Sequence, residues 1–332
     1  MNRLALLLDR AVARGVTPGG QAWVVDQGRT VVRLPFGRLW PGGPPVRTDT
    51  RYDLASLTKP LVTAVRAHQL VDQGILDLNQ PLGPGWLPAA PDATAGDLLA
   101  HGAGLAAHRP LGLGPHPSFG RIVWEAGRVP AVARPGARAL YSDLGFILLG
   151  AWVEWAGGVG LARWLRHEGA PLHMADGRTG DPPVPKAAPA AREVPAGRVH
   201  DDNARRMGGC AGHAGAFGSA DEVAAWVRRL WDDPELVSPA AWKRMQTPSD
   251  VPGSTRTLGW DRPSFGPTTS VPGWPARAIG HLGFTGTSLW MLPPRRTAAL
   301  LLTHRTWFGV NPDPIRALRR EFHRTVAEML GL

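Results

Sequence analysis

The stretch DLASLTKP, residues 53–60, places Ser56 three positions before Lys59, at the start of a helix predicted over 57–73. Residues i and i+3 share one face of a helix, so the two side chains can meet. A serine hydroxyl needs a partner to take its proton, and a lysine can do so where burial or a nearby cation lowers its pKa. The chain has 37 basic residues but only three lysines, and an arginine could not lose its proton here. The spacing fits a nucleophile and its base, and equally a helix-capping serine beside a solvated lysine.

The composition narrows the class of protein. With 332 residues the chain can form one large domain or two lobes. Its formal net charge of +10 comes from scattered arginines without a basic block, so we expect no nucleic-acid partner. Cys210 is the single cysteine, which excludes an intrachain disulfide. The first residues lack the long apolar region of a secretory signal, and the most apolar stretch, 144–158, contains Glu154. We therefore expect a cytoplasmic protein with no membrane span.

Periodic apolar patterns predict strands near both ends of the chain and helices between them. We expect helices over 2–14, 57–73, 93–104, 143–157, 159–169, 221–231 and 316–330, and strands over 21–28, 29–37, 256–262, 277–284, 287–293 and 297–305. Two strand regions around a helical insertion predict one sheet built from both ends of the chain, with a second, helical lobe. The expected lobes are a discontinuous α/β lobe of residues 1–75 and 250–332, and a mostly helical lobe of residues 76–249. The latter contains a Pro/Ala/Arg-rich loop at 177–198.

Two other segments hold candidate functional residues. Tyr141 and Asp143 stand directly before and at the start of a predicted helix. A phenol near a cationic lysine can have a depressed pKa and act as a general base; otherwise Tyr141 packs in the core and Asp143 caps the helix. The segment HLGFTG, residues 281–286, is expected to leave an edge strand and enter a glycine-rich turn. Such a turn lets the backbone approach a ligand closely, although a plain tight turn explains it as well.

Together these segments resemble the three motifs of the serine β-lactamase and penicillin-binding protein superfamily. The branch indicated is that of class C β-lactamases, DD-carboxypeptidases and related esterases. The Ser-x-x-Lys motif corresponds to 56–59, the Tyr-x-Asn motif to 141–143, and the Lys/His-Thr-Gly motif to 281–283. The resemblance implies an α+β, β-lactamase/transpeptidase-like fold. Such a fold has an antiparallel sheet flanked by helices, a mostly helical lobe, and the active site in the cleft between them.

The resemblance also implies roles for individual residues. Ser56 would be the acylated nucleophile, and Lys59 with Tyr141 would shuttle its proton. The backbone N–H groups of Ser56 and Phe284 would form the oxyanion hole. The residues implied to bind substrate are Asp143, His281, Gly283 and Thr285.

Three positions depart from the motifs. Asp143 replaces an asparagine, Leu282 replaces a hydroxyl residue, and His281 replaces the lysine with which class C β-lactamases hold a substrate carboxylate. We therefore expect a serine hydrolase that forms a Ser56 acyl-enzyme on ester or small amide substrates. The alternatives are a weak β-lactamase, a D-amino-acid-specific peptidase or DD-carboxypeptidase, and a non-catalytic ligand-binding homologue.

The remaining histidines have weaker assignments. His200 fits either a solvated loop or a residue lining the cleft, and His213 fits either a packed residue or a site residue. His101 and His108 are expected to be structural residues at helix ends. The His, Asp and Cys residues between 200 and 213 lack a recognised zinc spacing. We expect no metal and no cofactor, with a small-molecule ester, amide or lactam as the substrate.

Overall fold

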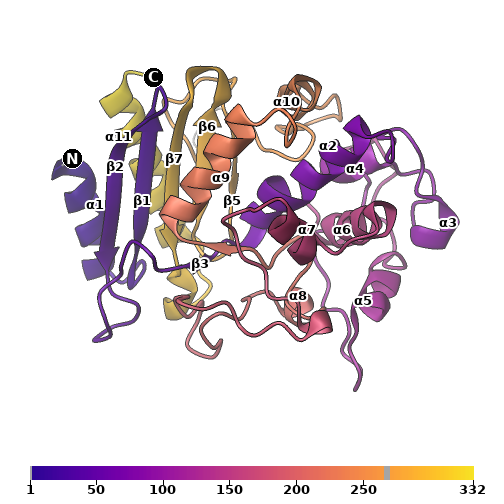
Figure 1. Cartoon of the computed structure of the whole chain (residues 1–332), viewed down its shortest axis with the longest axis horizontal. Coiled ribbons are helices and arrows are strands. Elements are labelled where there is room, and N and C mark those ends of the chain that lie inside the picture. The colour runs from indigo at the N-terminus through magenta and orange to yellow at the C-terminus, as the bar shows by residue number, and fades with distance from the viewer. Residues whose placement is uncertain (1, 265–269) are drawn as a thin grey trace.

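A five-stranded antiparallel sheet forms one side of the computed structural model, which describes residues 2–264 and 270–332 (Figure 1). Its strand order is β2-β1-β7-β6-β5. The strands are β1 (Gly19–Asp26), β2 (Arg29–Gly37), β5 (Ile279–Leu282), β6 (Ser288–Leu292) and β7 (Thr297–Thr303). Strands from the two ends of the chain therefore meet where β1 pairs with β7, with Trp23 opposite Leu300. The expected α+β class, with one sheet built from both ends, is confirmed.

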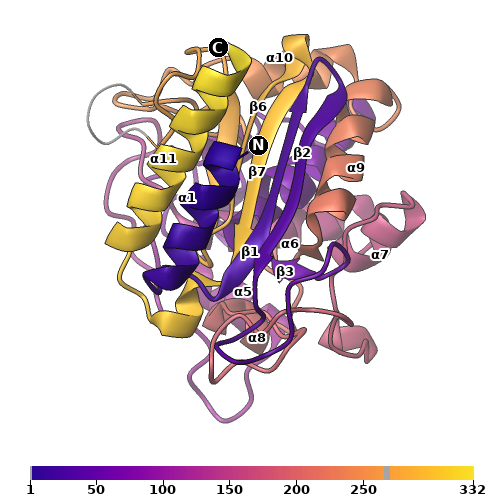
Figure 2. The same cartoon turned by 90° about the vertical axis from the view of Figure 1, so that its left-hand side faces the viewer.

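Helices cover both faces of this sheet. Helix α1 (Asn2–Ala13) and helix α11 (Asp313–Leu330) lie side by side on one face (Figure 2). They bury apolar side chains such as Leu8 and Phe322 against it. Helix α9 (Ala220–Asp232) packs on the other face, against β1 and β7. Because both faces are covered, β6 and β7 are buried along their whole length, which explains why their sequences are almost continuously apolar.

The remaining helices gather beside the sheet (Figure 1). Helix α6 (Asp143–Gly157) is buried from Leu144 to Val153, as its apolar composition on all sides predicts. The other helices are α2 (Val65–Asp72), α3 (Gly83–Trp86), α4 (Ala95–Leu99), α5 (Phe119–Ala126), α7 (Leu161–His167), α8 (Asp202–Arg206) and α10 (Pro239–Gln246). A two-stranded pair, β3 (Tyr52–Asp53) with β4 (Phe217–Gly218), links this region to the segment that carries Ser56.

The structure corrects parts of the expected layout. Residues 256–262 form no strand; they make only isolated bridges, Arg256 with Asp261 and Asp261 with Gly280. Two turn residues, Leu258 and Gly259, break this stretch, and Gly259 has a φ of +107°. Helix α9 falls within 76–249, which we expected to form the helical lobe, yet its apolar face packs on the sheet.

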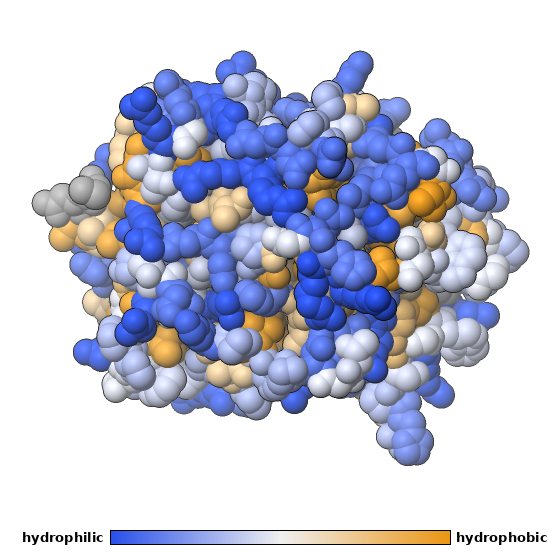
Figure 3. Space-filling view, in the orientation of Figure 1, coloured by the Kyte–Doolittle hydropathy of each residue, from blue (hydrophilic) through white to orange (hydrophobic). Residues whose placement is uncertain are grey.

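The long 177–198 segment contains one short helical turn, Gly177–Thr179, and residues in isolated bridges, but no strand. No single helix among the described residues has the length and apolar composition needed to cross a membrane. On the face shown in Figure 3 the surface is mostly hydrophilic, with apolar groups in small separate patches.

Candidate active site

Ser56 lies in a short 3₁₀ turn, Ala55–Leu57, that directly precedes a π-helical turn, Lys59–Ala64. Ser56 is partly exposed, whereas the residues on either side of it, 52–55 and 57–60, are buried. Ala55 has a φ of +48°, in the left-handed region that a residue with a Cβ rarely adopts. Strain of this kind persists where surrounding contacts fix it, and it is concentrated at functional sites.

Two proton-carrying groups contact the Ser56 hydroxyl. Lys59 Nζ lies 3.0 Å from Ser56 Oγ, as the i, i+3 spacing predicts. Tyr141 OH donates a hydrogen bond of 2.8 Å to the same oxygen. The Tyr141 ring is flanked by His101, whose ring centroid lies 4.6 Å away, and by the Arg256 guanidinium, 5.2 Å from the ring centroid. The structure therefore brings together the serine, lysine and tyrosine selected from the sequence.

Lys59 is held as a cation. Its side chain is fully buried, and Nζ donates to Asp143 Oδ1 at 2.7 Å and to the His213 carbonyl at 3.1 Å. Burial opposes the charge, but the Asp143 carboxylate and the nearby Tyr141 oxygen raise the pKa of Lys59 above its ordinary value. The same ion pair holds the pKa of Asp143 far below its usual range, against the effect of burial.

Tyr141 differs from our expectation. We expected a phenol with a depressed pKa, but burial raises the pKa of Tyr141, and the opposing effect of Lys59 does not overcome it. The error has a physical reason: burial disfavours the phenolate, and Asp143 partly offsets the lysine charge that would have stabilised it. The resting site therefore contains a cationic lysine, a carboxylate and a neutral phenol that donates to Ser56.

The turn after β5 packs directly against the Ser56 segment. The Thr285 hydroxyl donates to the Asp53 carbonyl at 2.8 Å, and the Thr287 hydroxyl donates to the Leu54 carbonyl at 3.3 Å. A Cβ on Gly283 would lie 2.0 Å from the Thr287 hydroxyl and 2.8 Å from the Leu54 carbonyl, so only glycine fits there. This approach places the Phe284 backbone beside the nucleophile segment. The hydroxyl of the buried Thr285 is hydrogen-bonded to the Asp53 carbonyl, so we no longer assign Thr285 to substrate binding.

His281 is neutral and enclosed. It is buried, its Nδ1 lies 2.8 Å from the Leu282 carbonyl, and its ring centroid lies 5.9 Å from that of Tyr141. Burial lowers the pKa of His281 to about 4, so it carries no charge at neutral pH. It is therefore unsuited to holding a substrate carboxylate as a lysine would.

Asp53 binds backbone groups of two chain segments at the site with its side chain. Its carboxylate accepts the Ala55 N–H at 2.8 Å and the His200 N–H at 2.7 Å. Burial raises the pKa of Asp53 to about 6. The centroid of the half-buried His200 ring lies 5.4 Å from that of the Phe284 ring. His200 therefore contacts the turn after β5 through the Phe284 side chain.

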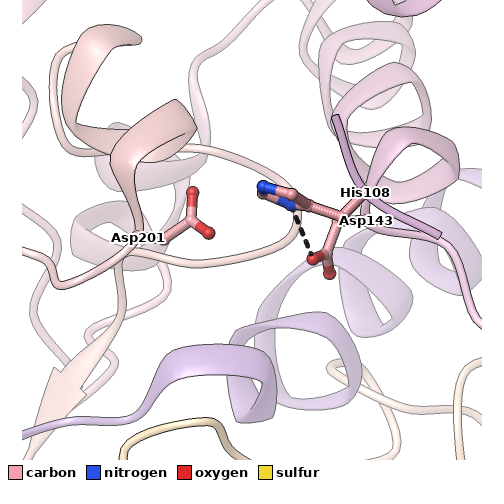
Figure 4. Close-up of side chains that lie close together, drawn as sticks. All are labelled: His108, Asp143 and Asp201. Carbon is pink, nitrogen blue, oxygen red and sulfur yellow. Dashed lines mark ion pairs between the residues drawn. The ribbon is translucent and has the colours of Figure 1, made fainter. Parts of the chain in front are cut away.

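A second ionisable group, His108, contacts the other oxygen of the Asp143 carboxylate. His108 Nδ1 lies 3.5 Å from Asp143 Oδ2, and Asp201 lies across from both (Figure 4). Asp201 in turn pairs with His213, whose Nε2 lies 2.8 Å from Asp201 Oδ1. Sequence reasoning assigned His108 to a structural helix end and gave Asp201 no role of its own. The HDD run at 200–202 was the only signal for Asp201, and none pointed to His108.

The ligand types in this group are those of a metal site. Ligand atoms of His108, Asp143 and Asp201 lie within 4.8 Å of one another, and three such ligands are the number in many catalytic zinc sites. However, Asp143 already binds the Lys59 ammonium and Asp201 binds His213. A dication would compete with both partners and would be repelled by Lys59. We assign no metal to these residues, and the expectation of a metal-free enzyme stays a prediction.

The fold and the three motifs define a protein of the serine β-lactamase and penicillin-binding protein type. The family model for beta-lactamase matches residues 4–322, so the chain belongs to the beta-lactamase family, a family of serine hydrolases. The resemblance inferred from the motifs is therefore confirmed.

Individual relatives have different activities in their names. The N-acetylmuramyl-L-alanine amidase of Bacillus subtilis (strain 168) is 26% identical over 365 aligned positions, covering 92% of this chain and 81% of the relative. A putative D-alanyl-D-alanine carboxypeptidase of Escherichia coli O157:H7 is 27% identical over 362 positions, covering 90% and 81%. The crystal structure of SurE with D-Leu is 25% identical with a TM-score of 0.73, covering 99% of this chain and 76% of that one. These names do not agree on one substrate.

Proposed function

We propose that this protein is a serine hydrolase that forms an acyl-enzyme at Ser56 and acts on ester or small amide substrates. The observation that carries the proposal is the position of Ser56 Oγ, 3.0 Å from Lys59 Nζ and 2.8 Å from Tyr141 OH. Both distances are within the range required for proton transfer. Ser56 is also the one partly exposed residue in an otherwise buried stretch, 52–60, so a substrate can reach it.

The resting protonation state sets the first requirement of the reaction. Neither the Lys59 ammonium nor a phenol that already donates to Ser56 Oγ can accept the serine proton. The Lys59–Tyr141 pair must therefore lose one proton before it can act as the base. Because the pKa values of both groups are raised, we expect the rate to increase with pH through the neutral and alkaline range.

The chemical steps then follow from the geometry. Ser56 Oγ bonds to the substrate carbonyl carbon as its proton passes to the deprotonated Lys59–Tyr141 pair. The carbonyl oxygen becomes an oxyanion, which the N–H groups of Ser56 and Phe284 would bind. The bond to the leaving group then breaks, and the pair returns the proton to the departing oxygen or nitrogen. Water repeats the sequence at the acyl carbon and releases Ser56.

The charge around the third motif favours neutral substrates. His281 is neutral, and the neighbouring Leu282 has no hydrogen-bonding side chain. The Arg256 guanidinium near Tyr141 is already paired with Asp261. None of these residues offers a free cation for the carboxylate of a β-lactam or a C-terminal D-alanine. We therefore rank esters and small amides first.

A D-amino-acid peptidase is the second candidate. It is favoured by relatives named as a D-alanyl-D-alanine carboxypeptidase and by SurE with D-Leu, at 27% and 25% identity. A substrate without a free carboxylate beside the scissile bond would be compatible with the neutral His281.

The test is the intact mass of the protein after brief exposure to p-nitrophenyl butyrate, a D-Ala-D-Ala peptide or a chromogenic cephalosporin. We expect a butyryl adduct on the wild type and on Ser118→Ala, whose serine only caps α5, and none on Ser56→Ala. Faster turnover of the peptide or the cephalosporin would replace the ester proposal. Absence of any adduct would favour a ligand-binding homologue without turnover.

A further inference from the structure

Arg319 is a buried charge bound to the turn that carries the proposed oxyanion-hole residue. It lies on α11 with 6% of its surface exposed. Its guanidinium donates to three backbone carbonyls of this turn: Nε to Gly286 O at 3.2 Å, and Nη2 to Thr287 O at 2.7 Å and to Gly283 O. In the described part of the chain it forms no ion pair with a carboxylate. A buried charge without a counter-ion destabilises a fold unless other groups offset the cost, and here the three carbonyls are the groups that do so.

The guanidinium stays charged at neutral pH. Burial, with the nearby charges of Arg305 and Arg316, lowers the pKa of Arg319 to about 9. That value is still above 7, so a full positive charge lies against these carbonyl oxygens.

One of these carbonyls belongs to the peptide group that supplies the Phe284 N–H. The Gly283 oxygen and the Phe284 nitrogen are the two ends of a single amide. A cationic donor at the oxygen draws electron density from the nitrogen, which makes the N–H more polar and a stronger donor. In the described part of the chain the Phe284 N–H has no hydrogen-bond partner, so this donor strength is available to a bound oxyanion.

Arg305 provides an internal comparison. Its Nε donates to the Phe284 carbonyl at 2.9 Å. That carbonyl belongs to the following peptide group, which contains the Thr285 N–H. Of the two arginines on this turn, only Arg319 is therefore bonded to the peptide group that carries the Phe284 N–H.

We propose that Arg319 is a positioning residue that strengthens the oxyanion hole, by polarising the Gly283–Phe284 peptide group as well as fixing the turn. The proposal rests on the proposed function, because it assumes that the Phe284 N–H binds the oxyanion of a Ser56 adduct. It extends that function by assigning part of the transition-state stabilisation to a side chain that touches neither substrate nor nucleophile.

The first measurement is the amide ¹⁵N chemical shift of Phe284 in protein labelled at its eight phenylalanines, with the signal assigned through Phe284→Leu. Loss of a charged donor from the Gly283 carbonyl should move this signal to a lower chemical shift in Arg319→Gln. Arg319→Lys should keep the wild-type shift, because an ammonium offers three donors for the three carbonyls. Arg295→Gln is the matched control, since Arg295 also binds α11, through the Leu330 carbonyl, but not the turn.

A pH titration of Arg319→Lys keeps the test decisive if Arg319→Gln does not fold. A buried ammonium titrates below its ordinary range, so the Phe284 signal should move toward the neutral-variant position as pH rises. The charged or titratable neighbours of Arg319 are Arg305, Arg316 and His323. The Phe284 signal also lies near two titratable groups, the His200 ring and Asp53. The pKa values of His323 and Asp53 are about 3 and about 6, and burial lowers that of His200. The movement of the signal is therefore measured relative to the wild type at the same pH. Signals that do not respond to either substitution or to pH would overturn the proposal.

The second measurement is the rate of Ser56 acylation by p-nitrophenyl butyrate, with the infrared carbonyl stretch of the acyl-enzyme. Removing a whole oxyanion donor costs about 10²–10³ in rate. Weakening one should slow Arg319→Gln about tenfold and raise its carbonyl frequency, while Arg319→Lys stays near the wild type at neutral pH. If the wild type forms no adduct, the proposed function fails. The Phe284 shift still decides the polarisation, because it needs no reaction.

Discussion

The two sides of Ser56 are built from different kinds of interaction. On the sheet side, the turn after β5 is fixed by buried hydroxyls and by Arg319, all bonded to backbone carbonyls. On the helical side, Lys59 and Asp143 form a buried ion pair, with His108 as a second partner of the carboxylate. The first side has permanent dipoles and an arginine charge; the second has groups that exchange protons.

The difference indicates a division of labour. A serine hydrolase needs a fixed geometry for the oxyanion and a mobile proton for the nucleophile. The sheet side suits the first need, because its donors keep their protons at neutral pH. The helical side suits the second. Asp53 is an exception on the sheet side, because it is a titratable group bonded to the backbone beside Ser56. Its titration therefore provides a test of the comparison.

The largest effect is expected for Lys59→Met, which removes the proton carrier. The rate of ester hydrolysis should fall by about 10²–10⁴, the usual contribution of general acid–base catalysis. The substitution also removes the buried cation that pairs with Asp143 and leaves His108 as its remaining partner, at a cost of up to about 3–5 kcal/mol in stability. Kinetics and urea unfolding of Lys59→Met and of Lys59→Met/Asp143→Asn separate the two effects. The double variant should regain stability but no activity; recovery of activity would show that Lys59 serves only as a counter-ion.

The next effect concerns Asp53, whose pKa is about 6 in the fold against an ordinary value of 3.8. The folded state therefore binds more protons than the unfolded state between these values, and stability falls as pH rises through this window. Two pH units correspond to about 3 kcal/mol. Urea unfolding of the wild type and Asp53→Asn at pH 4 and pH 7 measures this. The wild type should lose about 2 kcal/mol of this relative to the variant, because pH 4 already lies within the window. An equal difference at both pH values would contradict the burial of an ionised Asp53.

Asp143→Asn should shift the pH profile. The Asp143 carboxylate is the main group that stabilises the Lys59 cation. Its replacement by a neutral amide should lower the apparent pKa of the Lys59–Tyr141 pair. The rise in kcat/KM for an ester would then begin at lower pH, and the variant would be faster near pH 7. An unchanged profile would mean that the proton that limits the rate is not on the Lys59–Tyr141 pair. The proposed difference between the sheet side and the helical side would then be wrong.

Much of this site was predictable because the chemistry is local in sequence. The Ser56–Lys59 spacing predicts its own contact, and the glycine-rich turn at 281–286 predicts a close backbone approach. The fold class followed from strand patterns at both ends of the chain. In each case the pattern lies within one short element, so local geometry determines the result.

The errors came from contacts between distant segments. His108, Asp143 and Asp201 lie in separate parts of the chain and meet only in the folded protein. The pKa of Tyr141 was mispredicted for the same reason, since it depends on burial and on the Lys59–Asp143 pair together. Arg319 is one of many arginines in the sequence, and only its burial against the turn after β5 distinguishes it.

The smallest effect is expected for His108→Gln, at the exposed edge of the helical side. The hydrogen bond to Asp143 raises the pKa of His108, against partial burial. The ion pair therefore stabilises the fold at pH values below the ordinary pKa of histidine, and this stability is lost as pH rises through the raised pKa. Because the His108 side chain is 47% exposed, the effect should be below about 1 kcal/mol.

Thermal unfolding at pH 5.5 and pH 8.5 provides the check for His108→Gln. The variant should be slightly less stable than the wild type at pH 5.5 and equal to it at pH 8.5. Ester hydrolysis at pH 8.5 should also be unchanged, because the ion pair between His108 and Asp143 is lost as pH rises through the raised pKa of His108. A large loss of rate at pH 8.5 would mean that the neutral imidazole takes part in proton transfer. The proton path would then extend from Lys59 through Asp143 to the surface. The proton-exchanging groups on the helical side would then include His108 as well as the Lys59–Asp143 ion pair.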